Sequence, residues 1–206
     1  ISAGLREQFS YEFDGIDTLK TALAQQKGGI LISAHVGNFE IAERFFADID
    51  LNFQINLVTA DQEHSAIKDY LESIGQKTSL KWITLKEDMS HIFEINAALS
   101  ANELICFTGD RYVEGMKTLS SDFLGAAADF PAGPFLLASR LGVPVIFVYV
   151  MKEGKQHYHL YARQAQGLKH RDAQSVLQAY TDSVTHIVKK YPLQWFNFFD
   201  FWKRNA

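Results

Sequence analysis

The sequence has few of the features that mark secreted, nucleic-acid-binding or membrane-spanning proteins. Cys106 is its single cysteine, so no internal disulfide can form, and a chain of 206 residues can bury a full core without one. No run of five basic residues occurs, and 20 basic against 24 acidic side chains give a net charge of −4, so no nucleic-acid partner is expected. No segment of about 20 mostly apolar residues is present to cross a bilayer. With 47% apolar residues, the chain is expected to form one globular domain over residues 1–206.

Short apolar runs alternate with segments of helical spacing along most of the chain. The pattern predicts strands at 30–34, 54–59, 80–85, 104–108, 145–151 and 156–163. It predicts helices after Asn38 and at 62–73, 90–101, 133–141 and 173–191, with a lead-in at 1–27 and an irregular stretch between 108 and 133. Strands separated by helices need crossover connections, so we expect an α/β fold with a mostly parallel central sheet flanked by helices. Gly154 and Lys155 suggest one antiparallel pair, between the strands at 145–151 and 156–163.

His35 and Glu40 form the first candidate for chemistry. Chance alone gives about one His and acid pair at this spacing in such a composition, and His64 with Asp69 is a second. The latter pair lies in a predicted helix, where this spacing leaves the side chains roughly 140° apart. His35 instead follows a strand and precedes the predicted helix cap Asn38, so Glu40 can return to the imidazole, fix its tautomer and leave it as a general base. Alternatively, His35 only satisfies a strand end and Glu40 only serves the helix dipole.

Arg111 marks a second cluster, at the end of the predicted strand 104–108. It follows Gly109 and Asp110, and the planar fork of an arginine suits a phosphate or a carboxylate. We expect Asp110 to hold Arg111 in place for such an anion. The alternative is an ordinary ion pair in a loop.

A third cluster opens the predicted helix at 133–141. Pro131 and Pro134 stiffen the entry, and Gly133 lets backbone amides approach a ligand, which suits an anion or an oxyanion at a helix N-terminus. The alternative is a helix start without a ligand. His157 and His159 share one strand face, but no third ligand stands at a suitable spacing, so no metal site is expected.

The order of these motifs resembles that of a known superfamily, the glycerolipid and lysophospholipid acyltransferases. Its four motif blocks correspond here to residues 35–40, 107–111, 130–134 and 143–148. The details are most similar to the branch of lipid A late acyltransferases, the lauroyl and myristoyl acyltransferases, which includes related bacterial glycolipid acyltransferases. The segment Tyr-Pro-Leu-Gln-Trp-Phe at 191–196 resembles the closing signature of that branch. The resemblance extends from about residue 28 to residue 202.

The resemblance implies an O-acyltransferase. It would move a fatty acyl group from a thioester, on acyl carrier protein or coenzyme A, to a hydroxyl of a lipid or glycolipid, with no other cofactor. His35 and Glu40 would be the catalytic residues. Substrate binding would fall to Asn38, Gly109, Asp110, Arg111, Pro131, Gly133 and Pro134. The alternative is a non-catalytic or hydrolytic lipid-binding relative that kept the fold.

The C-terminal segment, residues 192–206, is rich in aromatic side chains. They are Trp195, Phe196, Phe198, Phe199, Phe201 and Trp202, and basic residues flank them at Lys189, Lys190, Lys203 and Arg204. This mixture favours an interfacial position, so we expect peripheral binding to a membrane surface, which the resemblance places at the cytoplasmic face of the inner membrane. The alternative is that the aromatic residues pack on the core.

Overall fold

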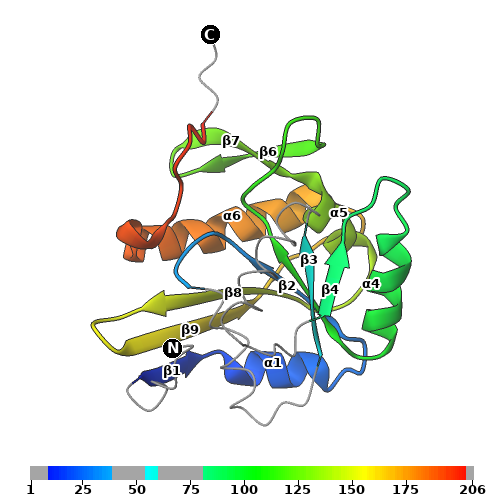
Figure 1. Cartoon of the computed structure of the whole chain (residues 1–206), viewed down its shortest axis with the longest axis horizontal. Helices are drawn as coiled ribbons and strands as arrows, with labels where there is room; N and C mark the ends of the chain where they lie inside the picture. The colour runs from blue at the N-terminus through cyan, green and yellow to red at the C-terminus, as the bar shows by residue number, and fades with distance from the viewer. Residues whose placement is uncertain (1–8, 39–53, 60–80, 203–206) are drawn as a thin grey trace, which may run out of the picture.

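The computed structural model describes residues 9–38, 54–59 and 81–202 (Figure 1). Two predicted helices, the one after Asn38 and the one at 62–73, lie outside these residues, and so does Glu40. Every strand and helix that the sequence predicts within the described residues is present, with boundaries shifted by one or two residues.

The main sheet is mostly parallel, as predicted. Its strands are β1 (Ser10–Asp14), β2 (Gly29–Ser33), β3 (Ile55–Thr59), β4 (Lys81–Thr84), β5 (Leu104–Thr108), β8 (Val145–Lys152) and β9 (His157–Gln164). They are arranged in the order β1-β9-β8-β2-β5-β3-β4, and the pair β8 and β9 alone is antiparallel among them. The two central strands β2 and β5 therefore run in the same direction, and their carboxyl ends meet at one edge.

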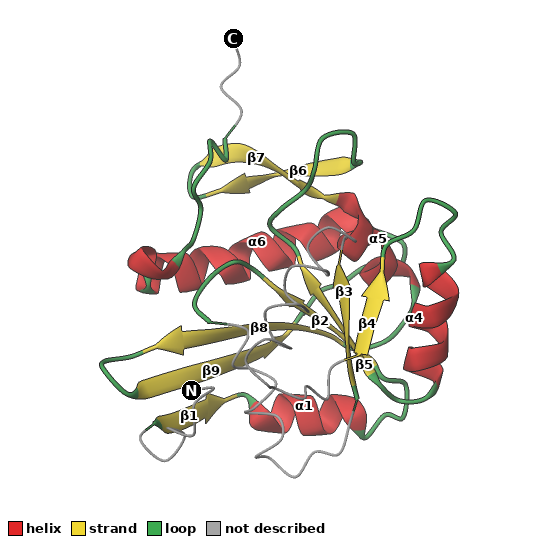
Figure 2. Cartoon of the chain, viewed as in Figure 1, coloured by secondary structure: helices red, strands yellow, loops and turns green. Residues whose placement is uncertain are grey.

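Helices cover both faces of this sheet (Figure 2). They are α1 (Ile16–Leu23), α4 (His91–Ser100), α5 (Ala132–Arg140) and α6 (Ala173–Lys190), followed by the short 3-10 turn η3 (Pro192–Gln194). Helix α1 lies on one face, and α5 and α6 lie on the other. The predicted α/β fold is confirmed.

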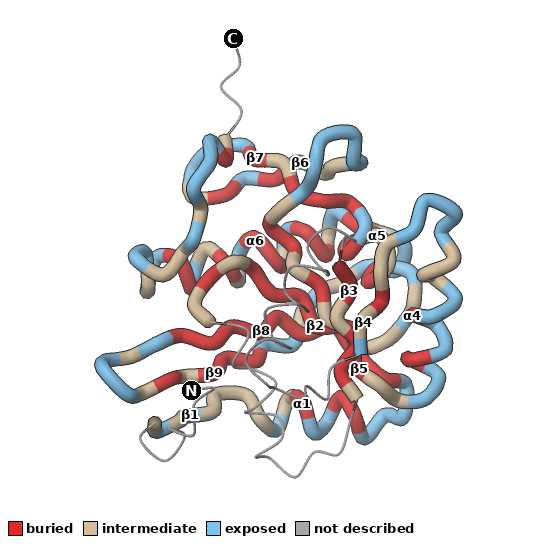
Figure 3. Tube along the Cα trace, viewed as in Figure 1, coloured by how far each residue is buried: buried red, intermediate tan, exposed pale blue. Residues whose placement is uncertain are grey.

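Strand β2 shows why the sheet needs cover on both faces. All five of its residues are buried (Figure 3), as expected of a central strand in a parallel sheet. Ile30 and Ile32 point into the core that contains α6, while Leu31 points into the core that contains α1. Burying each such side chain contributes roughly 1.5–3 kcal/mol. The strand that leads to His35 is thereby held rigidly.

The stretch predicted to be irregular is a hairpin, and this corrects the sequence analysis. Strands β6 (Thr118–Phe123) and β7 (Ala126–Pro131) pair antiparallel above α6 (Figure 1). Leu124 and Gly125 form the two-residue turn with φ of 55° and 92°. Two positive φ values suit the twist of a hairpin, but leucine is an unusual first residue there, so the usual turn signal is missing.

The first part of the described chain also holds structure that the sequence did not predict. Strand β1 lies at the edge of the sheet and pairs in parallel with β9. Helix α1 follows directly and buries Leu19, Ala22 and Leu23. These three residues have the spacing of one helix face, so the signal for this helix is present in the sequence and the prediction of a plain lead-in missed it. The lead-in therefore contributes one strand and one helix to the fold.

Candidate active site

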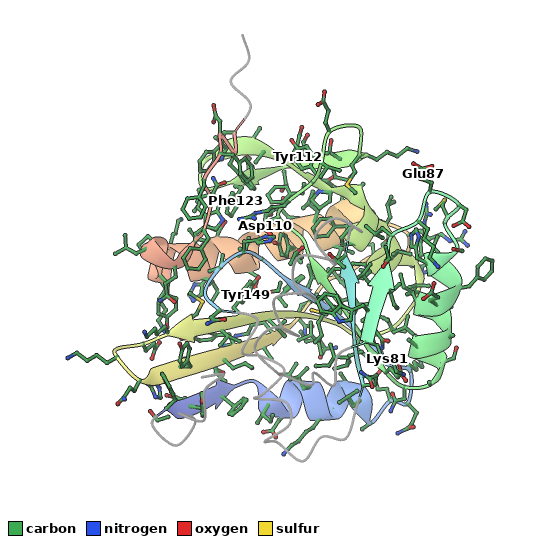
Figure 4. All side chains as sticks on the ribbon, in the orientation of Figure 1. Lys81, Glu87, Asp110, Tyr112, Phe123 and Tyr149 are labelled. Carbon is green, nitrogen blue, oxygen red and sulfur yellow. The ribbon has the colours of Figure 1, made fainter. Side chains whose placement is uncertain are left out.

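The site begins with the register of β2 and β5. Ser33, the last residue of β2, lies opposite Thr108, the last residue of β5. His35 stands two residues after the first, and Asp110 stands two residues after the second. Parallel pairing therefore delivers both side chains to the same edge of the sheet, where open α/β sheets place their ligands. Figure 4 shows Asp110 there, between the central strands and the β6–β7 hairpin.

His35 is held by Asp110 through two hydrogen bonds. The Nδ1 of the imidazole lies 2.8 Å from Oδ1 of Asp110, and the backbone N–H of His35 donates to Oδ2 over 2.9 Å. An ionised carboxylate only accepts hydrogen bonds, so Nδ1 carries the proton and Nε2 is the basic nitrogen of the ring. Asp110 is 4% exposed, which protects the pair from competing water. This arrangement suits a general base.

The structure differs here from the predicted pairing of Asp110 with Arg111. Both oxygens of Asp110 bond to His35, and the described residues show no ion pair between Asp110 and Arg111. The guanidinium of Arg111 instead donates from Nη2 to the backbone carbonyl of Phe196 over 2.6 Å. Arg111 thus ties the C-terminal segment to the site.

Residues 194–196 form one wall of the site. The N–H of Gly37 donates to the carbonyl of Gln194 over 2.8 Å, and the N–H of Phe196 donates to the carbonyl of His35 over 2.9 Å. Between them Val36 and Trp195 form an antiparallel bridge. The signature segment that closes the family resemblance therefore lies alongside the residues around His35.

The end of β8 forms the opposite wall. Gly37 bridges Val150 in parallel, and the N–H of Asn38 donates to the carbonyl of Val150 over 2.7 Å. Gly37 has a φ of 68°, and a Cβ added there would lie 2.1 Å from that carbonyl oxygen. Only glycine fits this close approach. The residues from His35 to Asn38 are thus held between β8 and the C-terminal segment.

These walls line an open pocket of about 560 Å³, which we call the His35 pocket. Its described lining consists of His35, Gly37, Asn38, Lys152, Tyr158, Gln194 and Phe196. The volume is in the usual range for sites that bind small molecules. Sequence reasoning assigned no role to Lys152, Tyr158 or Gln194. Gln194 could have been found from the signature segment, but only the pairing of β8 with β9 brings the other two to the pocket.

Asn38 and Tyr158 are linked within this lining. A hydrogen bond joins the side chain of Asn38 to the hydroxyl of Tyr158. Burial raises the pKa of Tyr158 above its ordinary value, and the bond to Asn38 opposes that shift. Tyr158 therefore stays a neutral phenol at physiological pH, and it faces the pocket as a polar, uncharged group.

Close packing around Gly109 leaves no room for a larger side chain. A Cβ there would lie 2.9 Å from Ile32 Cγ2 and equally close to the ring of Tyr180. The hydroxyl of Tyr180 in turn donates to the carbonyl of Ser33 over 3.2 Å. The glycine thus lets the loop that carries Asp110 lie tightly against α6 and β2.

The third predicted cluster is at the start of α5. Pro131 and Pro134 are buried, and Gly133 is exposed with open space where a Cβ would be. The described lining of the His35 pocket does not include these three residues. Their role in substrate binding stays a prediction, as does the role of Glu40, which lies outside the described residues.

The aromatic C-terminal segment has an inner and an outer side. Trp195, Phe201 and Trp202 surround Phe123 of the hairpin, with ring centroids 5.4, 5.4 and 6.3 Å away. The indole N–H of Trp202 also donates to the carbonyl of Phe123 over 2.9 Å. The outer side consists of the exposed side chains of Leu193, Phe196, Phe198 and Phe199. Packing on the core, the alternative reading, is thus correct for the inner three.

Within 9–38, 54–59 and 81–202, no group of three or more His, Cys, Asp or Glu side chains could hold a metal ion. None of the described helices has the length and apolar character needed to span a membrane.

Comparison with known proteins assigns the family. A model of the bacterial lipid A biosynthesis acyltransferases matches residues 4–204. The chain belongs to this family, which confirms the resemblance of its motifs.

The sequences of two relatives align with nearly the whole chain. Both are phosphatidylinositol mannoside acyltransferases of Mycobacterium tuberculosis, one from strain ATCC 25618 / H37Rv and one from strain CDC 1551 / Oshkosh. Each is 24% identical over 195 residues, which is 93% of this chain and 60% of the relative. The chain thus spans less than two thirds of the length of these relatives.

Proposed function

We propose that this protein is an O-acyltransferase that moves a fatty acyl group from a thioester to a hydroxyl of a lipid or glycolipid. The donor is acyl carrier protein or coenzyme A carrying the acyl chain. The observation that carries the proposal is the His35–Asp110 pair at a pocket of about 560 Å³. Membership of an acyltransferase family supports the same reaction.

The reaction requires one base and one acid, and His35 serves as both in turn. Nε2 takes the proton from the acceptor hydroxyl while the oxygen attacks the thioester carbonyl and forms the new C–O bond. The tetrahedral intermediate then collapses, the C–S bond breaks, and the thiolate leaves with the proton from His35. Asp110 keeps Nδ1 protonated and stabilises the imidazolium between the two steps. We also propose that Glu40, the second catalytic residue that the sequence predicts, takes part in catalysis with His35.

The acceptor is proposed to be a lipid with a sugar headgroup. The family takes its name from lipid A, and the two mycobacterial relatives are named for phosphatidylinositol mannoside. Both names describe glycolipids with several hydroxyl groups. A pocket lined by amides, a phenol and an ammonium group suits such a headgroup.

An acyl-transfer assay with His35→Ala tests the function. The purified chain is incubated with a labelled fatty acyl thioester of acyl carrier protein or of coenzyme A. The acceptor is a lipid A precursor or phosphatidylinositol mannoside, and the products are identified by mass. Loss of a general base typically costs 10² to 10⁴ in rate, so His35→Ala should lower turnover at least about 10²-fold while the protein stays folded. His186→Ala, on the exposed side of α6, is the matched control and should keep normal turnover.

Three outcomes would contradict the proposal. Near-normal turnover in a folded His35→Ala variant would exclude His35 as the base. Release of free fatty acid without acylated lipid would favour the hydrolytic alternative. Binding of lipid without any turnover by the unmodified protein would favour the non-catalytic one.

The exposed aromatic side of the C-terminal segment is proposed to contact a membrane surface, at the cytoplasmic face of the inner membrane. Leu193 is 94% exposed and Phe198 is 86% exposed, and Phe196 on the same segment lines the His35 pocket. Each buried aromatic side chain removes roughly 150 to 250 Å² from water, so two of them give useful affinity for a bilayer. A lipid acceptor would then reach the pocket directly from the surface.

Co-sedimentation with anionic vesicles tests this contact. Replacing both Phe198 and Phe199 by Ala should reduce binding, because neither belongs to the core. The matched control is Phe93→Ala, which removes a side chain that is 78% exposed on α4. If the unmodified protein stays in the supernatant at low salt, or if the double variant binds as well as the unmodified protein, this segment is not a membrane contact.

A further inference from the structure

Lys152 is a cationic side chain of the His35 pocket for which the reaction so far has no use. It is the last residue of β8 and lies directly opposite Tyr158 in the antiparallel pairing with β9. Directly opposed residues project on the same face of a sheet, and both side chains line the pocket. The ammonium group is therefore presented on the side where substrate would bind.

The backbone of Lys152 is fixed by Gln194. The N–H of Lys152 donates to Oε1 of Gln194, and Nε2 of Gln194 donates to the carbonyl of Lys152, both over 2.9 Å. This amide pair holds the strand end in one position against the C-terminal segment. These two hydrogen bonds involve only the backbone of Lys152, so the ammonium group remains able to bind a ligand, and its backbone anchor limits where it can lie.

Three lysines of the described chain form ion pairs, and Lys152 is among the described lysines that do not. Lys81 pairs with Glu103, Lys86 with Glu94 and Lys190 with Glu153. Among the described residues, the ammonium of Lys152 has no acidic partner within 4.0 Å. The following carboxylate, Glu153, contacts Tyr191 and His159 and is no partner for Lys152.

The second cation beside the site is already engaged. Arg111 donates to the carbonyl of Phe196, which ties down part of its planar fork. Lys152 is therefore the better placed of the two to meet an anionic group that enters the pocket. Its polar neighbours Asn38, Tyr158 and Gln194 can contribute further hydrogen bonds.

We propose that Lys152 binds a phosphate group of one of the two substrates. The inference rests on the proposed function, since phospholipid headgroups and phosphopantetheine thioesters both carry phosphate. A lysine ammonium is a strong point-charge partner for phosphate. Bound in this way, the phosphate fixes how far the reacting hydroxyl or thioester lies from His35, so Lys152 sets the position of the substrate and takes no part in proton transfer.

Binding measurements with two soluble probes test the site without acyl transfer. Coenzyme A represents the donor, and dihexanoylphosphatidylinositol, a short-chain lipid that stays monomeric, represents the acceptor. Lys152→Met keeps the apolar stem and removes the charge, and Lys152→Arg keeps the charge. Lys155→Met, in the turn between β8 and β9, removes the same charge outside the pocket lining and is the matched control.

Lys152→Met should weaken the binding of at least one probe about tenfold or more, because hydrogen bonds to charged groups are the strong ones. Lys152→Arg should restore most of that affinity, and Lys155→Met should change it less than about twofold. A loss for coenzyme A assigns the phosphate to the donor, and a loss for the lipid assigns it to the acceptor.

The inference is overturned if the unmodified protein binds neither probe, if Lys152→Met binds both normally, or if Lys155→Met loses as much affinity as Lys152→Met. These results are separable from the fate of the proposed function. If Lys152→Met loses binding and the unmodified protein transfers no acyl group, the phosphate site stands and the proposed enzymatic function is rejected. If the unmodified protein transfers acyl groups and Lys152→Met has normal binding and a normal KM, the proposed function stands and the phosphate site is rejected.

Discussion

Two polar clusters lie on opposite faces of the sheet at the end of β8, and they differ in which groups their side chains contact. Lys152 faces the His35 pocket, whereas the next residue, Glu153, faces a cluster with His159, Tyr161, Lys190 and Tyr191. We call this second group the Glu153 cluster. In it, the members contact one another.

The Glu153 cluster is held together by contacts among its own side chains, although the buried Nε2 of His159 has no hydrogen-bond partner among the described residues. The hydroxyl of Tyr191 donates to Glu153 and lies 2.6 Å from the hydroxyl of Tyr161, to which Lys190 donates over 2.7 Å. The ring of His159 stacks on that of Tyr161 with centroids 4.1 Å apart. Such a network ties the end of α6 to β9 and contributes to stability.

The His35 pocket is arranged differently. Its carboxylate, Asp110, positions a histidine, its amides fix backbone, and its ammonium group has no acidic partner among the described residues. Polar groups whose contacts close among themselves indicate structure, while polar groups held in position around a pocket indicate function. The following predictions test that distinction, from the largest expected effect to the smallest.

Asp110→Asn should lower kcat about 10²-fold, because asparagine cannot keep both bonds to His35 and can turn the imidazole to the wrong tautomer. KM should change little, since Asp110 positions His35 and does not bind substrate in the mechanism. Steady-state kinetics measure both constants. Glu153→Gln is the control from the other cluster and should leave kcat within about threefold of the unmodified enzyme. A folded Asp110→Asn variant with normal kcat would remove the distinction between the two clusters.

Arg111→Lys should raise KM for one substrate by several-fold, to about tenfold. Lysine keeps the charge but cannot donate from a planar fork, so it cannot bind an anion and hold the carbonyl of Phe196 at once. Substrate titrations at fixed donor and at fixed acceptor measure the effect. Unchanged affinity for both substrates would make Arg111 a structural tie between the site and the C-terminal segment.

Glu153→Gln should reduce the acid sensitivity of folding. The hydrogen bond from Tyr191, aided by His159 and Lys190, holds the pKa of Glu153 below its ordinary value against the opposing effect of burial. A carboxylate with a lowered native pKa stabilises the fold above the pKa of the unfolded chain, and this contribution is lost as pH falls through the native value. Urea unfolding at pH 7 and at pH 4 should therefore show a smaller loss for the variant than for the unmodified protein.

Glu87→Gln supplies the control for that measurement. Glu87 is exposed in the turn before α4, far from the end of β8 in Figure 4. It should keep the full acid sensitivity of the unmodified protein. Equal acid sensitivity in Glu153→Gln and the unmodified protein would show that the Glu153 cluster does not contribute through this charge.

The sequence predicts the central strands well because their signal is local. Strands β2 and β5 are continuous apolar runs bounded by turn residues, and their ends carry His35 and Asp110. The hairpin of β6 and β7 is missed because Phe123 and Phe130 gain their burial from α6 and from the C-terminal segment. Contacts between distant segments leave no period in the sequence.

The candidate site follows the same rule. His35 is predicted from its place at a strand end, but its bond to Asp110 depends on the register of two strands that lie far apart in the chain. Lys152 and Tyr158 reach the pocket through a hairpin whose existence is predicted and whose register is not. The roles of Trp195 and Trp202 likewise depend on which side of the segment meets Phe123.

The pairing of Val36 with Trp195 has a consequence for biosynthesis. These two residues are 159 positions apart, since 195 minus 36 is 159. During translation, His35 and Asp110 leave the ribosome long before residues 194–196, which form one wall of the pocket. A nascent chain, or one cut before Gln194, lacks this wall of the His35 pocket. If the protein has the proposed activity, we expect such a chain to transfer no acyl group.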